Sequence, residues 1–274
     1  MKNKNDEVNI FVLTHKKFDF PKKEINDIYM PLLCNSENIN EDWGYFKDST
    51  GDNISNLNKY YAELTGQYWA WKNTDADIIG FCHYRRFFAK NFLLKDLLDE
   101  KEIKRDLENF DIILPQLQYS NKCLIDRVKE GEGNNYGAKS KEYEKLRKII
   151  EKYCPDYLPS FDNIVYGKQA YFCNMFITRK EIANDYFEWL FFILNKLEKE
   201  IYFSEYESNN LRVLGFIGEV LLSIYVDKNN LKVKEKYLYY SQYDKLSYGV
   251  ILTKRFPLLL DTISKVAKVI KKSK

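Results

Sequence analysis

Three short apolar runs, each ending abruptly in polar or turn-forming residues, constrain the fold of this chain most strongly. They are VNIFVL at 8–13, DIIGFC at 77–82 and DIIL at 111–114, which stops at Pro115. Runs of this length that are rich in β-branched residues are typical of strands buried on both faces. A fourth run at 172–177 fits the same pattern.

Segments with helical periodicity separate these runs. Between residues 55 and 72, apolar side chains recur at spacings of three and four, which predicts one helix. A long helix is expected to open at Thr178, with Glu181 at the spacing of a capping box, and another to span about 210–226. Strands that alternate with helices predict an α/β domain with a mostly parallel central sheet.

Polar residues follow two of the predicted strands directly. His15 and Lys16 come after the first, and His83, Arg85 and Arg86 after the second. Ligands of such folds bind at the carboxyl ends of the strands. Arginine forks bind diphosphate oxygens in a bidentate manner and stay charged, so these residues are candidates for a diphosphate site. The alternative is a solvated surface, or partners for nearby acids.

The segment 48–55, DSTGDNIS, is a second candidate site. Asp48, Asp52 and Asn53 supply carboxylate and amide groups that can hold ribose or sugar hydroxyls. The alternative is a turn that caps the helix after it, with Ser55 as the N-cap.

Composition excludes several classes of protein. The 274 residues carry a net charge of +3, but the segment 254–274 alone has seven basic residues and one acid. That segment is net +6, which leaves −3 for the rest, so we expect no nucleic-acid partner. The five cysteines are scattered and only two histidines occur, which favours reduced thiols in the cytoplasm and argues against a His-rich zinc site. Phosphate-binding glycine motifs and the hydrolase nucleophile elbow are both missing.

Several longer motifs occur in a fixed order along the chain: DSTGDNISNLNKYYAELTGQYWAWKN at 48–73, IGFCHYRRFF at 79–88, NMFITRKE at 174–181 and RVLGFIGEVLL at 212–222. In these motifs the chain resembles the bacterial glycosyltransferases of capsular and exopolysaccharide biosynthesis, a family long catalogued as a domain of unknown function. The resemblance runs from about residue 9 to 226.

This resemblance implies a nucleotide-diphospho-sugar transferase. Its GT-A-like, Rossmann-type domain would span residues 1–245. In that class an acidic Asp-x-Asp commonly holds a divalent metal at the end of a strand. This chain carries His83-Tyr84-Arg85 at the corresponding place. We therefore expect no required cofactor and no metal site, with arginine neutralising the leaving diphosphate instead.

The resemblance also suggests a general base. Glu219 follows Gly215 and Gly218 and is similar to the glycine–acid motif that supplies the base in some inverting transferases. A capping or salt-bridging role at the start of a helix is the alternative, and Asp52 and Glu63 are rival carboxylates. Within the same motifs we assign acceptor binding to Glu63, Trp69, Trp71 and Asn174.

The predicted activity is transfer of a sugar from a UDP-sugar, with UDP-galactofuranose and UDP-galactose as candidates, to a lipid-linked oligosaccharide. The alternative is a non-catalytic carbohydrate-binding or assembly protein of the same pathway. Apolar residues at helical spacing between lysines predict a basic amphipathic helix within 246–274. It would either pack on the body or lie on the anionic inner leaflet of the cytoplasmic membrane, making the protein peripheral there.

Overall fold

The computed structural model describes residues 6–21, 27–91, 96–132, 137–207 and 211–241. Residues 1–239 form one compact unit, and residues 240–274 form a second. The predicted basic helix within 246–274 lies outside the described residues. In the part of the chain that is described, no helix combines the length and the apolar character that crossing a membrane requires.

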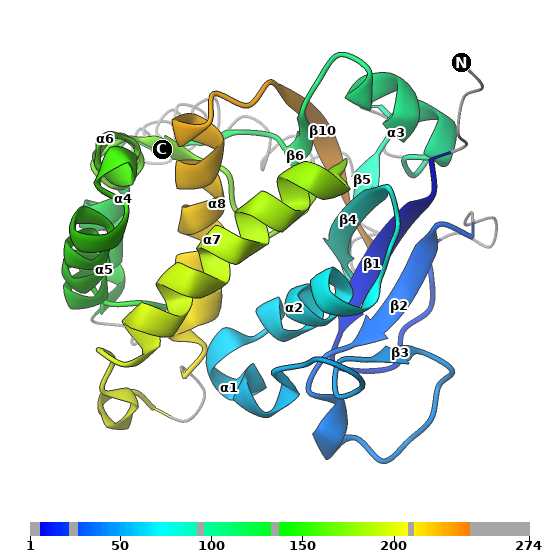
Figure 1. The fold of residues 1–274 in the computed structure, drawn as a ribbon, viewed down its shortest axis with the longest axis horizontal. Coiled ribbons are helices and arrows are strands. Elements are labelled where there is room, and N and C mark those ends of the chain that lie inside the picture. Colours follow the sequence, from blue (N-terminus) through cyan, green and yellow to red (C-terminus); the bar gives the residue numbers. More distant parts are fainter. Residues whose placement is uncertain (1–5, 22–26, 92–95, 133–136, 208–210, 242–274) are drawn as a thin grey trace, which may run out of the picture. The chain divides into compact units, whose positions relative to one another are not determined.

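The first unit is built from strands and helices that largely alternate (Figure 1). The strands are β1 (Val8–Thr14), β2 (Tyr29–Leu33), β3 (Phe46–Lys47), β4 (Ile78–His83), β5 (Arg86–Ala89), β6 (Ile112–Pro115), β7 (Gln118–Tyr119), β8 (Gln169–Ala170), β9 (Phe176–Arg179) and β10 (Val233–Tyr240). The helices are α1 (Asn58–Tyr61), α2 (Leu64–Asn73), α3 (Glu100–Leu107), α4 (Leu124–Glu132), α5 (Ser140–Tyr153), α6 (Leu158–Val165), α7 (Lys180–Glu198) and α8 (Val213–Lys228).

The main sheet is mixed rather than mostly parallel. Its order is β3-β2-β1-β4-β5-β10-β6-β9, and β9 also pairs with β4. The ladders β3–β2, β2–β1, β1–β4 and β6–β10 are parallel, as predicted, whereas β9 runs antiparallel to both β4 and β6. Short buried strands have the same continuous apolar pattern in either direction, so the sequence pattern did not reveal the reversal of β9.

Both faces of the sheet are buried, which explains the uninterrupted apolar runs. Along β1, Phe11 and Leu13 pack into one core cluster, while Ile10 and Val12 pack into another on the opposite face. This alternation follows from the two-residue period of a strand. The first cluster is covered by α2, α7 and α8, and Figure 1 shows α2 and α7 in front of β1 and β4. The second cluster contains residues of β5 and α3.

Two of the predicted helices begin or end elsewhere. The segment predicted as one helix from 55 to 72 is broken at Ala62, whose backbone has φ +50°. The side chain of Ser55 donates to Asp48 instead of capping a helix. Thr178 lies in β9 and donates to the carbonyl of Asp111, so α7 begins only at Lys180 and the capping box is wrong.

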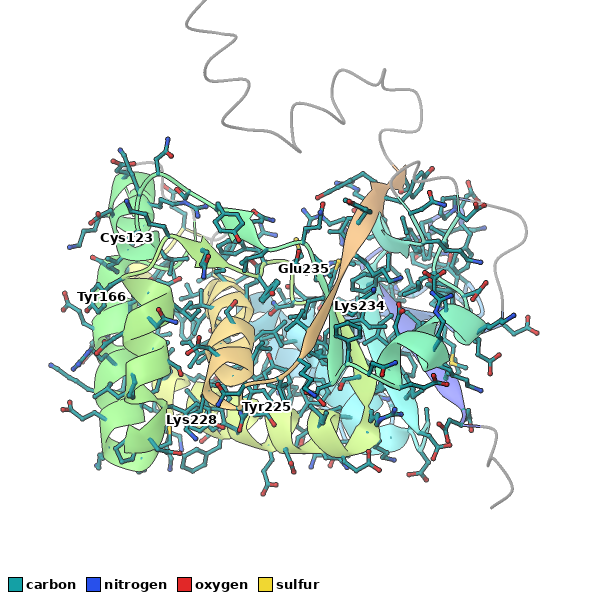
Figure 2. The ribbon with its side chains drawn as sticks, turned by 90° about the horizontal axis from the view of Figure 1, so that it is seen from above. Cys123, Tyr166, Tyr225, Lys228, Lys234 and Glu235 are labelled. Carbon is teal, nitrogen blue, oxygen red and sulfur yellow. The ribbon has the colours of Figure 1, made fainter. Side chains whose placement is uncertain are left out.

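β10 is joined to α3 by a buried ionic cluster. Lys236 Nζ lies 2.6 Å from Glu102 Oε1 and 2.7 Å from Asp106 Oδ2, and the side chains of Lys236 and Asp106 are each only 6% exposed. Figure 2 shows β10, with Lys234 and Glu235 labelled, and α8, with Tyr225 and Lys228 labelled near its carboxyl end. The cluster holds α3 against β10, which is itself a strand of the main sheet.

Candidate active site

The carboxyl ends of β1 and β4 lie side by side and bring the predicted cationic residues together. The parallel register pairs Leu13 with His83, and the backbone N–H of Tyr84 donates to the carbonyl of Leu13 at 3.1 Å. The residues that follow β1 and the residues that follow β4 therefore lie at the same edge of the sheet. His15 and Lys16 meet Tyr84 and Arg85 there.

Tyr84 is the centre of this group. Its ring centroid lies 5.3 Å from that of His15, edge to face, 5.4 Å from Lys16 Nζ and 4.8 Å from Arg85 Cζ. His15, Lys16 and Arg85 are exposed. The pKa of His15 is lowered by its surroundings. Burial is the main cause, and the positive charges of Lys16, Arg85 and Arg212 add to it. The imidazole is thus kept neutral at neutral pH and can still donate a hydrogen bond.

Glu219 lies in α8, in its second turn, and not after a turn as the glycine-flanked motif suggested. Helical spacing places Arg212, Phe216 and Glu219 along one face, and the guanidinium of Arg212 lies 5.1 Å from the Phe216 ring. Burial raises the pKa of Glu219 to about 7, with the charge of Glu63 as the second cause; a hydrogen bond from the backbone of Cys173 and the charges of Arg86 and Arg212 oppose the rise.

The two glycines before Glu219 allow α8 to approach the broken helix closely. A Cβ on Gly215 would lie 3.1 Å from the Cβ of Ala62 and 3.2 Å from the carbonyl oxygen of Tyr61. A Cβ on Gly218 would lie 2.8 Å from Leu64 Cδ1. The glycines therefore serve helix packing, and through it they set how near Glu219 lies to Glu63.

An irregular segment, residues 171–174, which ends in a turn at Cys173 and Asn174, runs along the same face of α8. The hydroxyl of Ser223 contacts both the N–H and the carbonyl of Tyr171, at 2.9 and 3.1 Å. One turn earlier on the helix, Glu219 accepts from the N–H of Cys173. Another turn earlier, the carbonyl of Gly215 accepts from Asn174 Nδ2 at 3.0 Å. The segment and the helix are thus bonded at each turn.

Cys173 also connects Glu219 to the last residue of β4, His83, and to the first residue of β5, Arg86. His83 Nε2 lies 2.7 Å from the carbonyl oxygen of Cys173, which can only accept, so Nε2 carries a proton and donates it. Burial is the main cause that lowers the pKa of His83. Arg86 hydrogen-bonds to the Cys173 thiol, although burial still raises the pKa of that thiol to about 11. His83 therefore supports the site and is not a free ligand for the donor.

Glu63 is joined to the same segment from the other side. It precedes α2, and its Oε1 accepts from Asn174 Nδ2 at 2.8 Å. Asn174 itself is 1% exposed. Three residues around this point have left-handed backbone conformations without being glycine: Ala62 (φ +50°), Cys173 (φ +86°) and Asn174 (φ +48°). Such strained residues cost on the order of 1–3 kcal/mol each and concentrate at functional sites.

Asp48 has a structural role. Its carboxylate is completely buried and accepts hydrogen bonds from the N–H groups of Asn35 and Ser36 and from the hydroxyls of Ser36, Ser55 and Thr65, all at 2.6–3.0 Å. A carboxylate enclosed in this way offers nothing to a donor sugar. The prediction that Asp48 binds the donor is therefore corrected: it secures the loop before α1.

Asp52 and Asn53 lie away from the cluster. The N–H of Asp52 donates to the side-chain oxygen Oδ1 of Asn73, the last residue of α2, whereas Glu63 immediately precedes the first residue of that helix. Ten helical residues span about 15 Å. The side chain of Asn53 donates to the carbonyls of Ser49 and Gly51 and so stabilises its own turn. The structure does not bring either residue to the strand ends.

The two tryptophans predicted to bind the acceptor are packing residues. Trp69 is 6% exposed, and its Nε1 donates to Thr50 at 2.9 Å. Trp71 lies between α2 and α7, with its ring parallel to that of Phe191 and its Nε1 bonded to Asn184. Neither indole reaches the strand ends. Of the residues assigned to the acceptor, Glu63 and Asn174 do lie in the cluster.

Sequence reasoning missed two members of the cluster. Arg212 stands directly before α8 and influences both His15 and Glu219. Cys173 contributes its peptide groups and its thiol. Arg212 was detectable, because it lies seven residues before Glu219 and hence on the same helical face. No local pattern marks the backbone contacts of Cys173.

The residues at the end of β4 do not fit a hard divalent cation. Such ions take carboxylate and carbonyl oxygens, whereas this strand leads into a histidine, a tyrosine and two arginines. Within the described ranges, no group of three or more His, Cys, Asp and Glu side chains is arranged to hold a metal.

Comparison with solved structures identifies the class of this fold. The chain is similar to the apo structure of WbbM, a bifunctional glycosyltransferase, with 33% identity and a TM-score of 0.76. The match covers 86% of this chain and 45% of that chain, so this chain spans less than half of its relative's length. Its fold is thus that of part of a glycosyltransferase.

The family is defined by sequence. Residues 9–230 match the model described as Domain of unknown function (DUF4422), and the chain belongs to this family. No curated protein matches. The resemblance to a glycosyltransferase-related family is confirmed at this level, while the particular signature in the motifs stays a prediction.

Proposed function

We propose that this protein is a glycosyltransferase that uses a nucleotide-diphospho-sugar and needs no divalent metal. The observation that carries the proposal is the placement of Glu219, a carboxylate with a pKa of about 7, beside Arg86 and Arg212 at the carboxyl ends of β1 and β4. A carboxylate of this kind can take a proton at neutral pH, and the arginines can receive a negatively charged leaving group. The similarity to a glycosyltransferase supports the same class of reaction.

The donor diphosphate is assigned to the cationic residues Lys16, Arg85, Arg86 and Arg212, with neutral His15 as a further hydrogen-bond donor. Lys16 and Arg85 are exposed around the Tyr84 ring, and the positive charges of Arg86 and Arg212 act on Glu219 and favour its ionised form. Guanidinium groups neutralise the charge that develops on the leaving diphosphate as its bond to the sugar breaks.

Glu219 is assigned as the general base of an inverting reaction. It removes the proton from an acceptor hydroxyl, and the oxygen then attacks the anomeric carbon of the donor. The bond from that carbon to the diphosphate breaks, and the nucleoside diphosphate leaves with the electron pair. A base with a pKa near the working pH is both free to accept the proton and strong enough to hold it.

The proposal extends to the donor, the acceptor and the pathway of the reaction. We infer a UDP-sugar donor, a GT-A-like arrangement of the nucleotide site and a lipid-linked oligosaccharide acceptor in capsule or exopolysaccharide synthesis. The protein would then act at the inner face of the cytoplasmic membrane, with residues 254–274 as its contact with anionic lipid.

The proposal is tested by measuring nucleoside diphosphate release from a panel of nucleotide-sugars, with and without saccharide acceptors. We expect slow release from one donor and faster release once an acceptor is added. Glu219→Gln should abolish the acceptor-dependent rate while leaving donor binding intact, with Asp52→Asn as a matched control that keeps the rate. Donor or saccharide binding without any release would instead identify a non-catalytic binding protein.

A further inference from the structure

The Cys173–Asn174 turn is bonded to both carboxylates of the candidate site. The N–H of Cys173 donates to Glu219, and the side chain of the next residue, Asn174, donates to Glu63 at 2.8 Å. Adjacent Cα atoms are separated by only about 3.8 Å, so donors on adjacent residues bring their two acceptors close together.

A second hydrogen bond of Asn174 also fixes the position of Glu63 relative to Glu219. Asn174 Nδ2 also donates to the carbonyl of Gly215 at 3.0 Å, and Gly215 lies one turn before Glu219 on α8. One buried nitrogen thus joins the start of α2 to the turn of α8 that carries the base. The missing side chains of Gly215 and Gly218 permit this approach.

We propose that Glu63 is a positioning residue for the base: the Cys173–Asn174 turn holds it beside Glu219 as one carboxylate pair. This inference rests on the proposed function only where it concerns turnover. The negative charge of Glu63, held close by, disfavours the ionised form of Glu219, so Glu219 keeps its proton to a higher pH than it would without that charge.

Other titratable and charged side chains also face Glu219 from the elements packed around it. Arg86 of β5 and Arg212, which precedes α8, favour its ionised form. His83 of β4 is neutral and bonded to Cys173, and the Cys173 thiol stays protonated at neutral pH. Tyr143 of α5 has a raised pKa, caused chiefly by burial and then by the charge of Glu219, so it too is uncharged. Glu63 is therefore the group whose charge opposes ionisation of the base.

The test is a double-mutant cycle followed by the pH dependence of unfolding in urea. The difference in stability between the wild type and Glu219→Gln, measured across pH, reports the titration of Glu219. The same difference is then measured in a Glu63→Gln background. We expect the midpoint to move toward acid by about one pH unit when the charge of Glu63 is absent. An Asp52→Asn background, which removes a carboxylate at the other end of α2, should leave the midpoint in place.

A second variant tests the turn itself. Asn174→Gly keeps the left-handed backbone without strain but releases Glu63, so it should move the midpoint in the same direction. The acid limb of kcat/KM should follow in both variants. An unchanged midpoint in the Glu63→Gln background would overturn the pairing while leaving the transferase proposal standing. Because the cycle needs no turnover, a protein that transfers no sugar would still report whether the pair exists.

Discussion

Glu219→Gln should make this protein more stable at about pH 8 and leave its stability nearly unchanged at about pH 4. The folded state raises the pKa of Glu219 from 4.5 to about 7. Between these values the unfolded chain has lost the proton and the folded protein keeps it, so wild-type stability falls as pH rises. Above about pH 7 both states are ionised and the loss is complete. Glutamine, which resembles the protonated acid, has no such loss.

The magnitude follows from the same two values. At about 1.4 kcal/mol per pH unit, a rise from 4.5 to about 7 corresponds to roughly 3 kcal/mol. Glu219 is half-buried, and water screens part of the unfavourable charge. We therefore expect the variant to gain about 1.5–3 kcal/mol at alkaline pH. A loss of activity together with a gain of stability is typical of residues kept for function.

The assay is urea unfolding, followed by tryptophan fluorescence, at several pH values between about 4 and 8. Glu181→Gln is a suitable control, because Glu181 is an exposed carboxylate in the first turn of α7. It should show only a small change, of opposite sign, from the lost interaction with the helix dipole. If Glu219→Gln is no more stable than the wild type at alkaline pH, Glu219 does not have a raised pKa in the folded protein.

Four further outcomes are expected. Arg85→Lys and Arg86→Lys should each weaken UDP binding and turnover at least about tenfold, since a point charge cannot replace a planar fork; unchanged values in both would make these arginines surface groups. Activity should survive excess EDTA, and complete loss with rescue by Mn²⁺ would refute metal independence. Lys236→Met should lower the unfolding free energy by about 3 kcal/mol, because Glu102 and Asp106 of α3 lose their buried cation and keep only the exposed Arg105; a urea midpoint equal to the wild type would contradict this. Truncation after Gly249 should abolish salt-sensitive binding to anionic vesicles without changing the melting temperature, whereas an early-melting truncated protein would indicate that 254–274 packs on the body.

The sequence predicted the elements that carry the cationic residues. The apolar runs at 8–13 and 77–82 became β1 and β4, because side chains buried on both faces of a sheet leave an unmistakable continuous pattern. The residues that follow neighbouring parallel strands lie at the same edge of the sheet. The placement of Lys16 and Arg85 around one ring, that of Tyr84, therefore follows from the direction of the strands. Glu219, which the sequence marked as a candidate base, lies in α8 under the influence of Arg86 and Arg212, although its glycines suggested a turn; its role as a base stays a prediction.

Only the tertiary structure decided which of the other polar residues belong with them. Asp48 and Trp69 looked like ligands for a sugar, but both are enclosed by the fold. Ala62 broke an otherwise regular helical pattern and thereby placed Glu63 at the start of α2. Asn174 was assigned from its motif, but its contacts with Glu63 and Gly215 appear only in the folded chain, and the peptide contacts of Cys173 had no sequence signal.

The physical reason is the range over which each effect acts. Periodicity and strand direction are properties of neighbouring residues, and a single sequence displays them. The pKa of Glu219 depends on burial and on charges from β5 and α2, which are far away along the chain. Whether a carboxylate becomes a base, a structural hub like Asp48 or an exposed surface group is settled when those elements pack together.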